Sequence, residues 1–427
     1  MEALFNALKK APSIAAWKVN IEARKSCELF YVQTKVETNR ATDTIDTHVT
    51  IYIDVDGKRG QSSFAVYPYM DEAEISKLIE ENVFAAKFTL NRFFELPSPS
   101  DAPIHQVESN LSKRPFKEII GEIGNAIMAA NHLENGSLSA TEIFLYQIDT
   151  RIVNSNGVDV ASRRYECHIE TIPNFANGEE EVELYQAISF GSFDPKELTA
   201  KVAEALTLCK DRSAAQKLPV AGPLPVILEG EEIEEFFGAF VDDLRYETAF
   251  SKANVYEPGS NIQGEAPTGD VLNITLKPVV EGALASSSVD GDGVILPEVK
   301  LIENGVAKCR HGSFQVGYYL GEAHPTGRIP VVEVAPGTKS LEDWRKAPYL
   351  RCVKFSGIQV DLHSGMLGGE VRLGYYFDGE KEIPVTGFSI QADARQAITC
   401  FQASKQTMVR DRYFGPKYIY IPDVKIA

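Results

Sequence analysis

The chain has 427 residues, of which 44% are hydrophobic and 24% charged, a balance typical of a globular protein large enough for two domains. Its 43 Lys and Arg against 60 Asp and Glu give a formal charge of −17, and the acidic surplus is spread along the chain. Such a charge repels the phosphates of nucleic acids, so we expect no direct nucleic-acid binding. No apolar run approaches the roughly 18 residues of a membrane span, so we expect no membrane contact either.

The start of the chain and its cysteines both indicate a reducing, cytoplasmic setting. Acidic Glu2 stands where a signal peptide would carry a basic residue, and Asn6 and Lys9 break the apolar run that follows. The six cysteines lie far apart and form no C-x-x-C pair. We therefore expect reduced, mostly buried thiols, with no disulfide framework and no zinc knuckle.

The first part of the chain predicts an antiparallel sheet with helices. Residues 27–67 alternate polar and apolar side chains, are rich in Val, Thr and Tyr, and contain the turn sequence VDGK. Residues 70–96 change to helical spacing, with apolar positions that run from Ile75 to Leu90. A second amphipathic helix begins near Pro115.

A hairpin and a further helix complete this half. In NSNG, residues 154–157, the pair Asn156 and Gly157 is expected to supply the positive φ values of a tight hairpin. A helix follows Asp194, and the proline-rich residues 217–226 mark a domain boundary. We predict an N-terminal α+β domain over residues 1–217, in which long helices pack against an antiparallel sheet.

The remaining residues, 218–427, predict a β-rich C-terminal domain. Short apolar runs of strand character alternate with turns that contain Gly, Asp and Pro, and few helices interrupt them. Strands this frequent indicate a barrel-like or sandwich-like antiparallel body.

One helix stands out in this second half, with the sequence EGEEIEEFFGAFVDDL at residues 229–244. Its apolar residues recur every three or four positions and form one stripe that we expect to be buried. The acidic residues fall outside the stripe, and we expect them to form a solvated face: Glu231, Glu232, Glu234, Glu235, Asp242 and Asp243.

This helix begins like the metal-binding helix of a metalloprotease but contains no histidine. A zinc protease needs neutral imidazoles on one helix face and an adjacent Glu that deprotonates the metal-bound water. No histidine occurs between His168 and His311. Carboxylates that converge can hold Ca²⁺ or Mg²⁺, which stays an alternative. We predict no metal, no other cofactor and no catalytic residue.

The loop LASSSVDGDG, residues 284–293, admits two interpretations. Three serines followed by Asp290 and Asp292 are consistent with a nucleophile-rich or metal-binding loop, and the same composition is typical of a tight turn. The chain has no G-x-S-x-G motif and no phosphate-binding loop of either common kind.

Several segments, in their order and spacing, resemble the TldD/PmbA family, which is also called the modulator of DNA gyrase family. The most specific element is LIENGV followed by a PTG loop. IVNSNG, in the first half, resembles the signature of the family's N-terminal domain. The segments of the second half are SSSVDGDGV (286–294), LIENGVAK (301–308), LGEAHPTGR (320–328), FSGIQVDLHSG (355–365) and IPVTGFSI (383–390).

The resemblance implies an N-terminal α+β domain, a C-terminal barrel-like domain, and one of two branches. The TldD branch binds zinc through an H-E-x-x-x-H helix and a later cysteine, and it cleaves peptides. The PmbA branch, also called TldE, lacks these ligands and pairs with the catalytic chain. Here residues 229–244 carry Glu and Phe in place of the histidines, and the last cysteine is Cys400. The chain is therefore closer to the metal-free branch.

The resemblance thus implies a non-catalytic partner of a TldD-like catalytic subunit, or a homodimer, that helps enclose an extended peptide substrate. Two segments, SGMLGGEVRLGYYFDGEK and SIQADARQA, differ from the usual PmbA pattern and put the standard partner and substrate in doubt. The candidate cleft-lining residues are Glu231, Glu232, Glu235, Asp290, Asp292, Asn304, His324 and Thr326.

Two other functions remain open at this point. In the first, a stand-alone peptidase or hydrolase uses Glu231, Glu232 or Glu235 together with His311 or His324 as a metal or acid/base site. In the second, the chain regulates gyrase without proteolysis, an alternative that rests on the family label alone.

Overall fold

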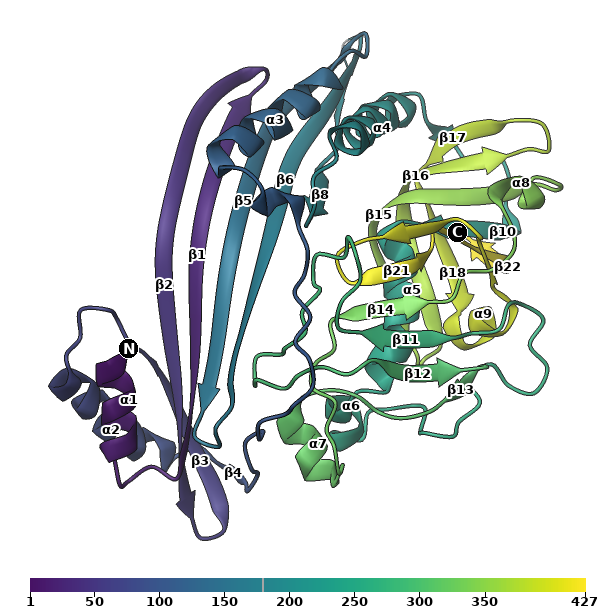
Figure 1. Ribbon diagram of the computed structural model, residues 1–427. Coiled ribbons are helices and arrows are strands. Elements are labelled where there is room, and N and C mark those ends of the chain that lie inside the picture. Colours follow the sequence, from purple (N-terminus) through teal and green to yellow (C-terminus); the bar gives the residue numbers. More distant parts are fainter. Residues whose placement is uncertain (179) are drawn as a thin grey trace.

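A long, twisted antiparallel sheet forms most of the N-terminal half. The structure is a computed structural model and describes residues 1–178 and 180–427. The strands run in the order β4-β3-β2-β1-β5-β6-β7, and β8 also pairs with β6. Their bounds are β1 (Ala16–Val32), β2 (Lys35–Val55), β3 (Lys58–Ala65), β4 (Leu90–Arg92), β5 (Gly136–Asn154), β6 (Asp159–Asn177), β7 (Glu180–Glu183) and β8 (Gln186–Phe190). Figure 1 shows the four long strands standing beside the rest of the molecule.

Alternation along β1 separates the two faces of this sheet. Odd-numbered residues pack against helices: Val19 against α1 (Glu2–Lys10) and α2 (Glu72–Ala86), and Leu29 against α3 (Phe116–Ala129) and α4 (Pro195–Ser213). Even-numbered residues near the start of β1 face the C-terminal domain instead. A short 3₁₀ turn, η1 (Asn110–Ser112), precedes α3.

The sequence prediction needs two local corrections in this half. The helix predicted over residues 70–96 ends at Ala86, because Leu90 pairs in β4 with Gly60 of β3, and this strand pairing overrides the helical spacing. In the 154–157 turn only Gly157 has a positive φ, of 97°. Asn154 Oδ1 stabilises this turn by accepting from the backbone N–H groups of Asn156 and Val158.

The C-terminal half contains a closed five-stranded barrel, which confirms the barrel-like alternative. The strand order is β15-β10-β22-β18-β16, and β15 closes the ring by pairing with β16. All of these pairs are antiparallel except β10–β15. The barrel strands are β10 (Gly222–Glu229), β15 (Tyr349–Asp361), β16 (Met366–Phe377), β18 (Phe388–Asp393) and β22 (Tyr418–Ile426); β17 (Glu382–Thr386), β9 (Gln216–Lys217) and β19 (Gln402–Ala403) extend the sheet.

A six-stranded sheet completes this half and encloses one helix against the barrel. Its order is β13-β12-β11-β14-β21-β20, with bounds Val306–Ala307, Val299–Glu303, Ile274–Lys277, Val331–Val334, Tyr413–Pro416 and Thr407–Val409. One core cluster joins apolar side chains of the barrel, of α5 (Glu231–Asp243) and of this sheet. The smaller helices are α6 (Tyr246–Phe250), α7 (Phe314–Leu320), α8 (Leu341–Trp344) and α9 (Ala394–Cys400).

Polar contacts join the two halves at both ends of the long sheet. At the α4 end, Tyr375 Oη donates to Asp211 at 2.5 Å. At the β4 end, Tyr319 Oη donates to the carbonyl of Arg92 at 2.9 Å. No helix in the described part of the chain is long and apolar enough to cross a bilayer.

Candidate functional site

The helix predicted within residues 229–244 is observed as α5, and its apolar stripe is buried as predicted. Phe236, Phe237 and Phe240 are fully buried, and the ring of Phe237 meets that of Phe401 edge to face at 5.5 Å. Gly230, with a φ of 77°, ends β10 and allows the chain to turn directly into the helix. The helix is therefore held rigidly between the barrel and the six-stranded sheet.

The predicted solvated acidic face is wrong at two positions. Glu232 is only 3% exposed and Asp243 only 6%. Asp243 accepts from the backbone N–H groups of Val255 and Tyr256, at 2.7 and 2.8 Å, and so fixes the segment that follows α6. The barrel and this segment cover more of the helix than its apolar stripe alone requires.

Burial has a direct electrostatic effect on Glu232. Desolvation raises the pKa of its carboxyl to about 7, and the nearby charge of Glu231 raises it further, while the helix N–H of Glu232 itself lowers it. The fully buried thiol of Cys352 also has a raised pKa, again mainly through burial. A carboxyl in such a position exchanges a proton near neutral pH, but it faces the core rather than a cleft.

The exposed side of α5 borders a cavity of about 620 Å³. Glu235 lines it, together with Glu234, Asp242 and residues of the six-stranded sheet. Glu231 points elsewhere and lies 3.5 Å from Arg410. Of the three α5 carboxylates singled out from the sequence, Glu235 alone is among the residues that line this cavity.

His311 also lines the cavity, and one hydrogen bond fixes its ring. Its Nε2 donates to the carbonyl of Val241 at 3.0 Å, and its side chain is 5% exposed. Burial lowers its pKa to about 4, so the ring is neutral at physiological pH. His324, in contrast, is exposed in the loop between α7 and β14.

These groups do not fit a zinc ion. Among residues 1–178 and 180–427 no three His, Cys, Asp or Glu side chains gather in a metal-binding cluster. The α5 carboxylates diverge, since Glu232 is buried and Glu231 lies near Arg410. No reaction step through a metal is derived from this donor set.

The loop of residues 286–294 forms a turn in which Asp290 is the central acceptor. Its carboxylate accepts from three backbone N–H groups, those of Asp292, Val294 and Arg328, at 2.9, 3.0 and 3.1 Å. Burial raises the pKa of this carboxyl. The serine hydroxyls of the loop bond to backbone groups as well, for example Ser288 to His105. These contacts are those of a structural turn.

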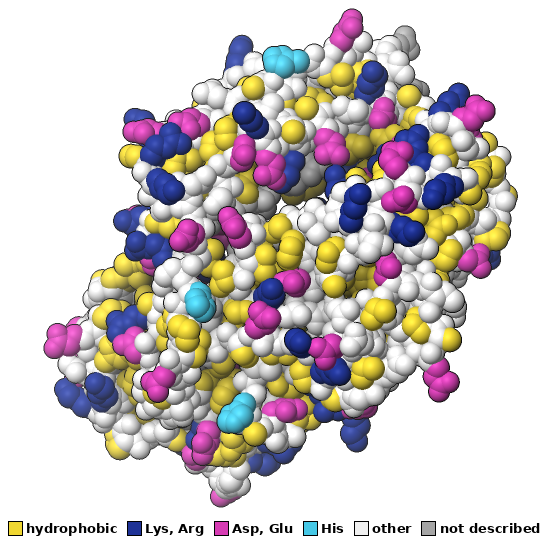
Figure 2. Space-filling model, turned by 45° about the vertical axis from the view of Figure 1, so that its right-hand side comes forward, with side chains coloured by type: hydrophobic (Ala, Val, Ile, Leu, Met, Phe, Trp, Pro, Cys, Tyr) yellow, Lys and Arg dark blue, Asp and Glu magenta, His cyan; other side chains and the backbone are white. Residues whose placement is uncertain are grey.

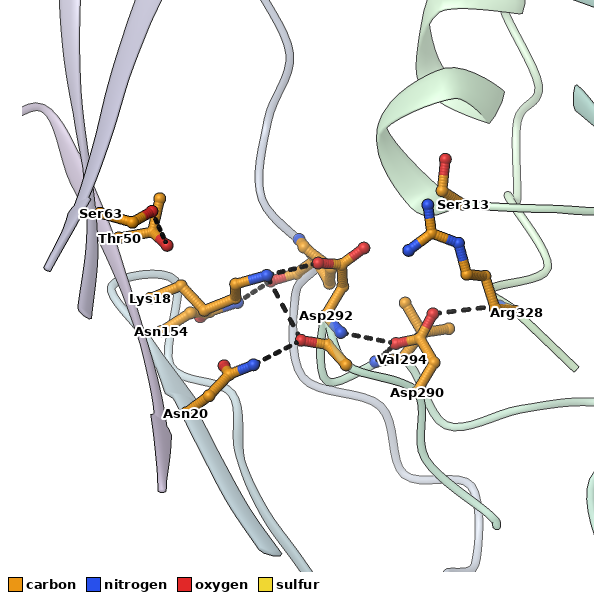
Figure 3. Close-up of polar contacts among 12 residues, drawn as sticks. Lys18, Asn20, Thr50, Ser63, Asn154, Asp290, Asp292, Val294, Ser313 and Arg328 are labelled. Atoms are coloured by element: carbon orange, nitrogen blue, oxygen red, sulfur yellow. Dashed lines mark hydrogen bonds and ion pairs between the residues drawn. The ribbon is translucent and has the colours of Figure 1, made fainter. Parts of the chain in front are cut away.

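The same loop docks on the N-terminal sheet through Asp292. Lys18 Nζ lies 2.5 Å from Asp292, in an ion pair whose side chains are 16% and 26% exposed. Asn20 donates to the carbonyl of Gly291 at 3.1 Å. Figure 3 shows Lys18 and Asn20 pointing from the sheet toward this loop. The two aspartates therefore have different roles, Asp290 inside the turn and Asp292 between the domains.

The remaining candidates have turn and loop roles. Asn304 has a φ of 53° in the β12–β13 turn, and its N–H donates to Asn273. Thr326 accepts from the N–H of Gly312 at 3.2 Å and donates to the carbonyl of Gly327. Neither residue lines the α5 cavity or the space between the domains.

Sequence reasoning missed a groove between the long sheet and the 286–294 loop, with a volume of about 630 Å³. Neighbouring strands β2, β1, β5 and β6 form its floor, and Ser287, Val289 and Gly291 lie over it. Alternation along each strand could have placed the floor residues on one face. The roof comes from a loop more than 120 residues further along the chain, which no local pattern reveals.

The C-terminal half of the chain matches a model of a known protein family. Residues 221–427 match the family model PmbA/TldA metallopeptidase C-terminal domain. Comparison with curated protein sequences gives no significant match.

Three solved structures share the fold over the whole chain. TldE from Thermococcus kodakarensis superposes with a TM-score of 0.81 at 15% identity, covering 100% of this chain and 99% of that one. A "putative modulator of a DNA gyrase" from Thermotoga maritima gives 0.78 at 18%, with 100% and 99% covered. A "putative modulator of DNA gyrase" from Bacteroides thetaiotaomicron gives 0.79 at 14%, with 100% and 97% covered. At these identities the likeness concerns the fold.

Replacing Glu232 by Gln is expected to stabilise the protein at pH 8. The folded chain keeps a proton on Glu232 between about pH 4.5 and 7 that the unfolded chain has lost, so this group makes stability fall as pH rises through that window. The variant lacks this fall, and its free energy of unfolding at pH 8 should exceed that of wild type by about 2–3 kcal/mol. Urea titrations at several pH values measure it. The exposed neighbour Glu231→Gln is the control, and equal pH profiles for E232Q and wild type would contradict the assignment.

Asp290→Ala is expected to destabilise the protein by about 2–3 kcal/mol, because three part-buried N–H groups lose their acceptor. Asp292→Ala removes only the ion pair with Lys18 and should cost about 1 kcal/mol. Urea unfolding midpoints of both variants give the comparison. A larger loss for D292A than for D290A would refute the turn role of Asp290.

Proposed function

Because residues 221–427 belong to the PmbA/TldD family, we propose that this chain is a non-catalytic subunit that pairs with a metal-bearing, TldD-like chain and helps enclose an extended peptide. The observation that carries the proposal is α5. In the family resemblance, α5 lies where the zinc-binding helix would be. Its phenylalanines are buried in the core, and its carboxylates point in different directions. In this assembly the partner binds the metal and cleaves the peptide, and this chain contributes part of the surface that encloses the peptide.

The surroundings of α5 support a binding role over a catalytic one. The cavity beside it, of about 620 Å³, is in the range of small-molecule and peptide side-chain sites. Its acidic groups are largely occupied: Asp242 pairs with Arg245, and Glu234 lies near Arg410. A second copy of this chain is the alternative partner.

A stand-alone hydrolase finds less support. Such an enzyme needs a base within hydrogen-bond reach of a nucleophile or of a metal-bound water. Glu232 faces the core, and the Nε2 of His311 is engaged by a backbone carbonyl. The proton-exchanging carboxyl is therefore buried away from the cavity that His311 lines.

A role at gyrase is suggested only by the names of two structural neighbours. Figure 2 shows acidic and basic side chains interspersed over one face of the molecule, without a large patch of a single sign. Together with a net charge of −17, this surface favours a protein partner over direct contact with DNA.

The proposal predicts peptide hydrolysis only in the mixed assembly. The purified chain is incubated with an unstructured peptide and one equivalent of zinc, alone and together with a TldD-like chain from the same organism. We expect no turnover alone, co-elution of the two chains in gel filtration, and turnover in the mixture. A mixture in which the TldD-like chain has lost its first zinc-binding histidine is the control and should be inactive.

Two results would contradict this function. The first is zinc-dependent hydrolysis by this chain alone. The second is failure of the two chains to co-elute together with the absence of any change in the hydrolysis rate on mixing.

A further inference from the structure

The floor of the groove between the domains consists of two rows of side chains that cross four strands. In one row Asn20 of β1 lies between His48 of β2 and Ile152 of β5, and Ile152 is paired with Val160 of β6. In the other row Glu22 lies between Asp46 and Thr150, and Thr150 is paired with a serine of β6. All of these side chains share one face of the sheet and line the groove.

The two ends of the groove carry opposite charge. Asp46 stands at the β2 end, Glu22 beside it on β1 forms an ion pair with Arg24 at 3.1 Å, and Arg164 stands at the β6 end. Asp46 is exposed, and no cation pairs with it in the part of the chain that the structure describes. Arg164 is 34% exposed, and its Nε lies 3.5 Å from Glu166, at the limit of a hydrogen bond. Both terminal charges are therefore accessible to a ligand.

The middle of the groove is suited to a polypeptide backbone. The hydroxyls of Thr150 and Ser162 can donate to or accept from peptide groups. Val289 of the roof, with Ile152 and Val160 of the floor, offers apolar contact for small alkyl side chains. Neither set of groups selects a particular sequence.

The distance between the ends sets the ligand's length. Four strands span three spacings of about 4.8 Å, or roughly 14 Å. Asp46 is in register with Ser162, and Arg164 lies two residues, or about 7 Å, further along β6, so the two ends are roughly 16 Å apart. An extended chain advances about 3.4 Å per residue, so about four to five residues cover this span.

We propose that this groove binds short peptides with free ends, about four to five residues long, with the amino terminus at Asp46 and the carboxylate at Arg164. The peptide lies across the strands, under the 286–294 loop. This inference rests on the proposed role in peptide processing and narrows it, because it assigns to this chain the holding of short, free-ended peptides.

The test is isothermal titration calorimetry of the full chain with tetra-alanine in three forms: free, N-acetylated and C-amidated. Each cap removes one terminal charge and should weaken binding by about three- to tenfold. Asp46→Asn should weaken the free peptide by a similar factor and leave the affinity of the acetylated peptide unchanged. Arg164→Gln should behave in the same way toward the amidated peptide.

Two neighbouring residues provide matched controls. Asp43 is on the same strand as Asp46 but on the opposite face, where it pairs with Lys25, and Arg163 adjoins Arg164 and pairs with Asp149. D43N and R163Q should therefore leave tetra-alanine binding unchanged. Circular dichroism of all four variants shows whether each is folded, and the capped peptides test the wild-type chain independently of any variant.

Absence of tetra-alanine binding, equal affinity for the free and the two capped peptides, or equal effects of D43N and D46N would each overturn the inference. The proposed function is judged separately, by hydrolysis in the mixed assembly. If D46N and R164Q chains support that hydrolysis as wild type does and the termini do not matter, the groove assignment fails and the partner role stands.

Discussion

The packing of α5 between the barrel and the six-stranded sheet is the constraint on which the rest of this structure depends. Three phenylalanines on adjacent turns fix the helix from two sides and leave only a narrow strip for polar groups. The same packing buries Glu232 and Asp243, and the Asp243 carboxylate accepts from the backbone N–H of Val255. Few side chains on the helix remain free for chemistry, and those that do point in different directions.

A second set of contacts positions the two halves. The 286–294 loop reaches the long sheet through Lys18 and Asn20, while Tyr375 and Tyr319 tie the ends of the sheet to the C-terminal domain. The loop stands above the sheet and leaves a groove beneath it. The burial of α5 and the docking of this loop favour a role in ligand binding over a role in catalysis.

Much of this could be predicted from the sequence, because the dominant signals were periodic. Alternation indicated the long strands, three- and four-residue spacing indicated the stripe of α5, and frequent short strands indicated the barrel. The end of α2 could not be predicted, since pairing of Leu90 with Gly60 decides it. The burial of Glu232 could not be predicted either. Helical periodicity shows which side of a helix is polar, but not which strands from distant parts of the sequence cover that side. Asp290 and Asp292 are two positions apart but have different roles, because Asp290 accepts from the N–H of Arg328 and Asp292 pairs with Lys18.

The central claim is that the α5 region cannot hold a catalytic metal. The most direct test is the zinc content of the purified full chain, measured by elemental analysis after incubation with zinc and dialysis against metal-free buffer. The account predicts less than about a tenth of a zinc ion per chain, since the donor set offers no converging ligands. About one zinc ion per chain, lost on replacing Glu235 or His311, would contradict it and favour a stand-alone metal-dependent enzyme.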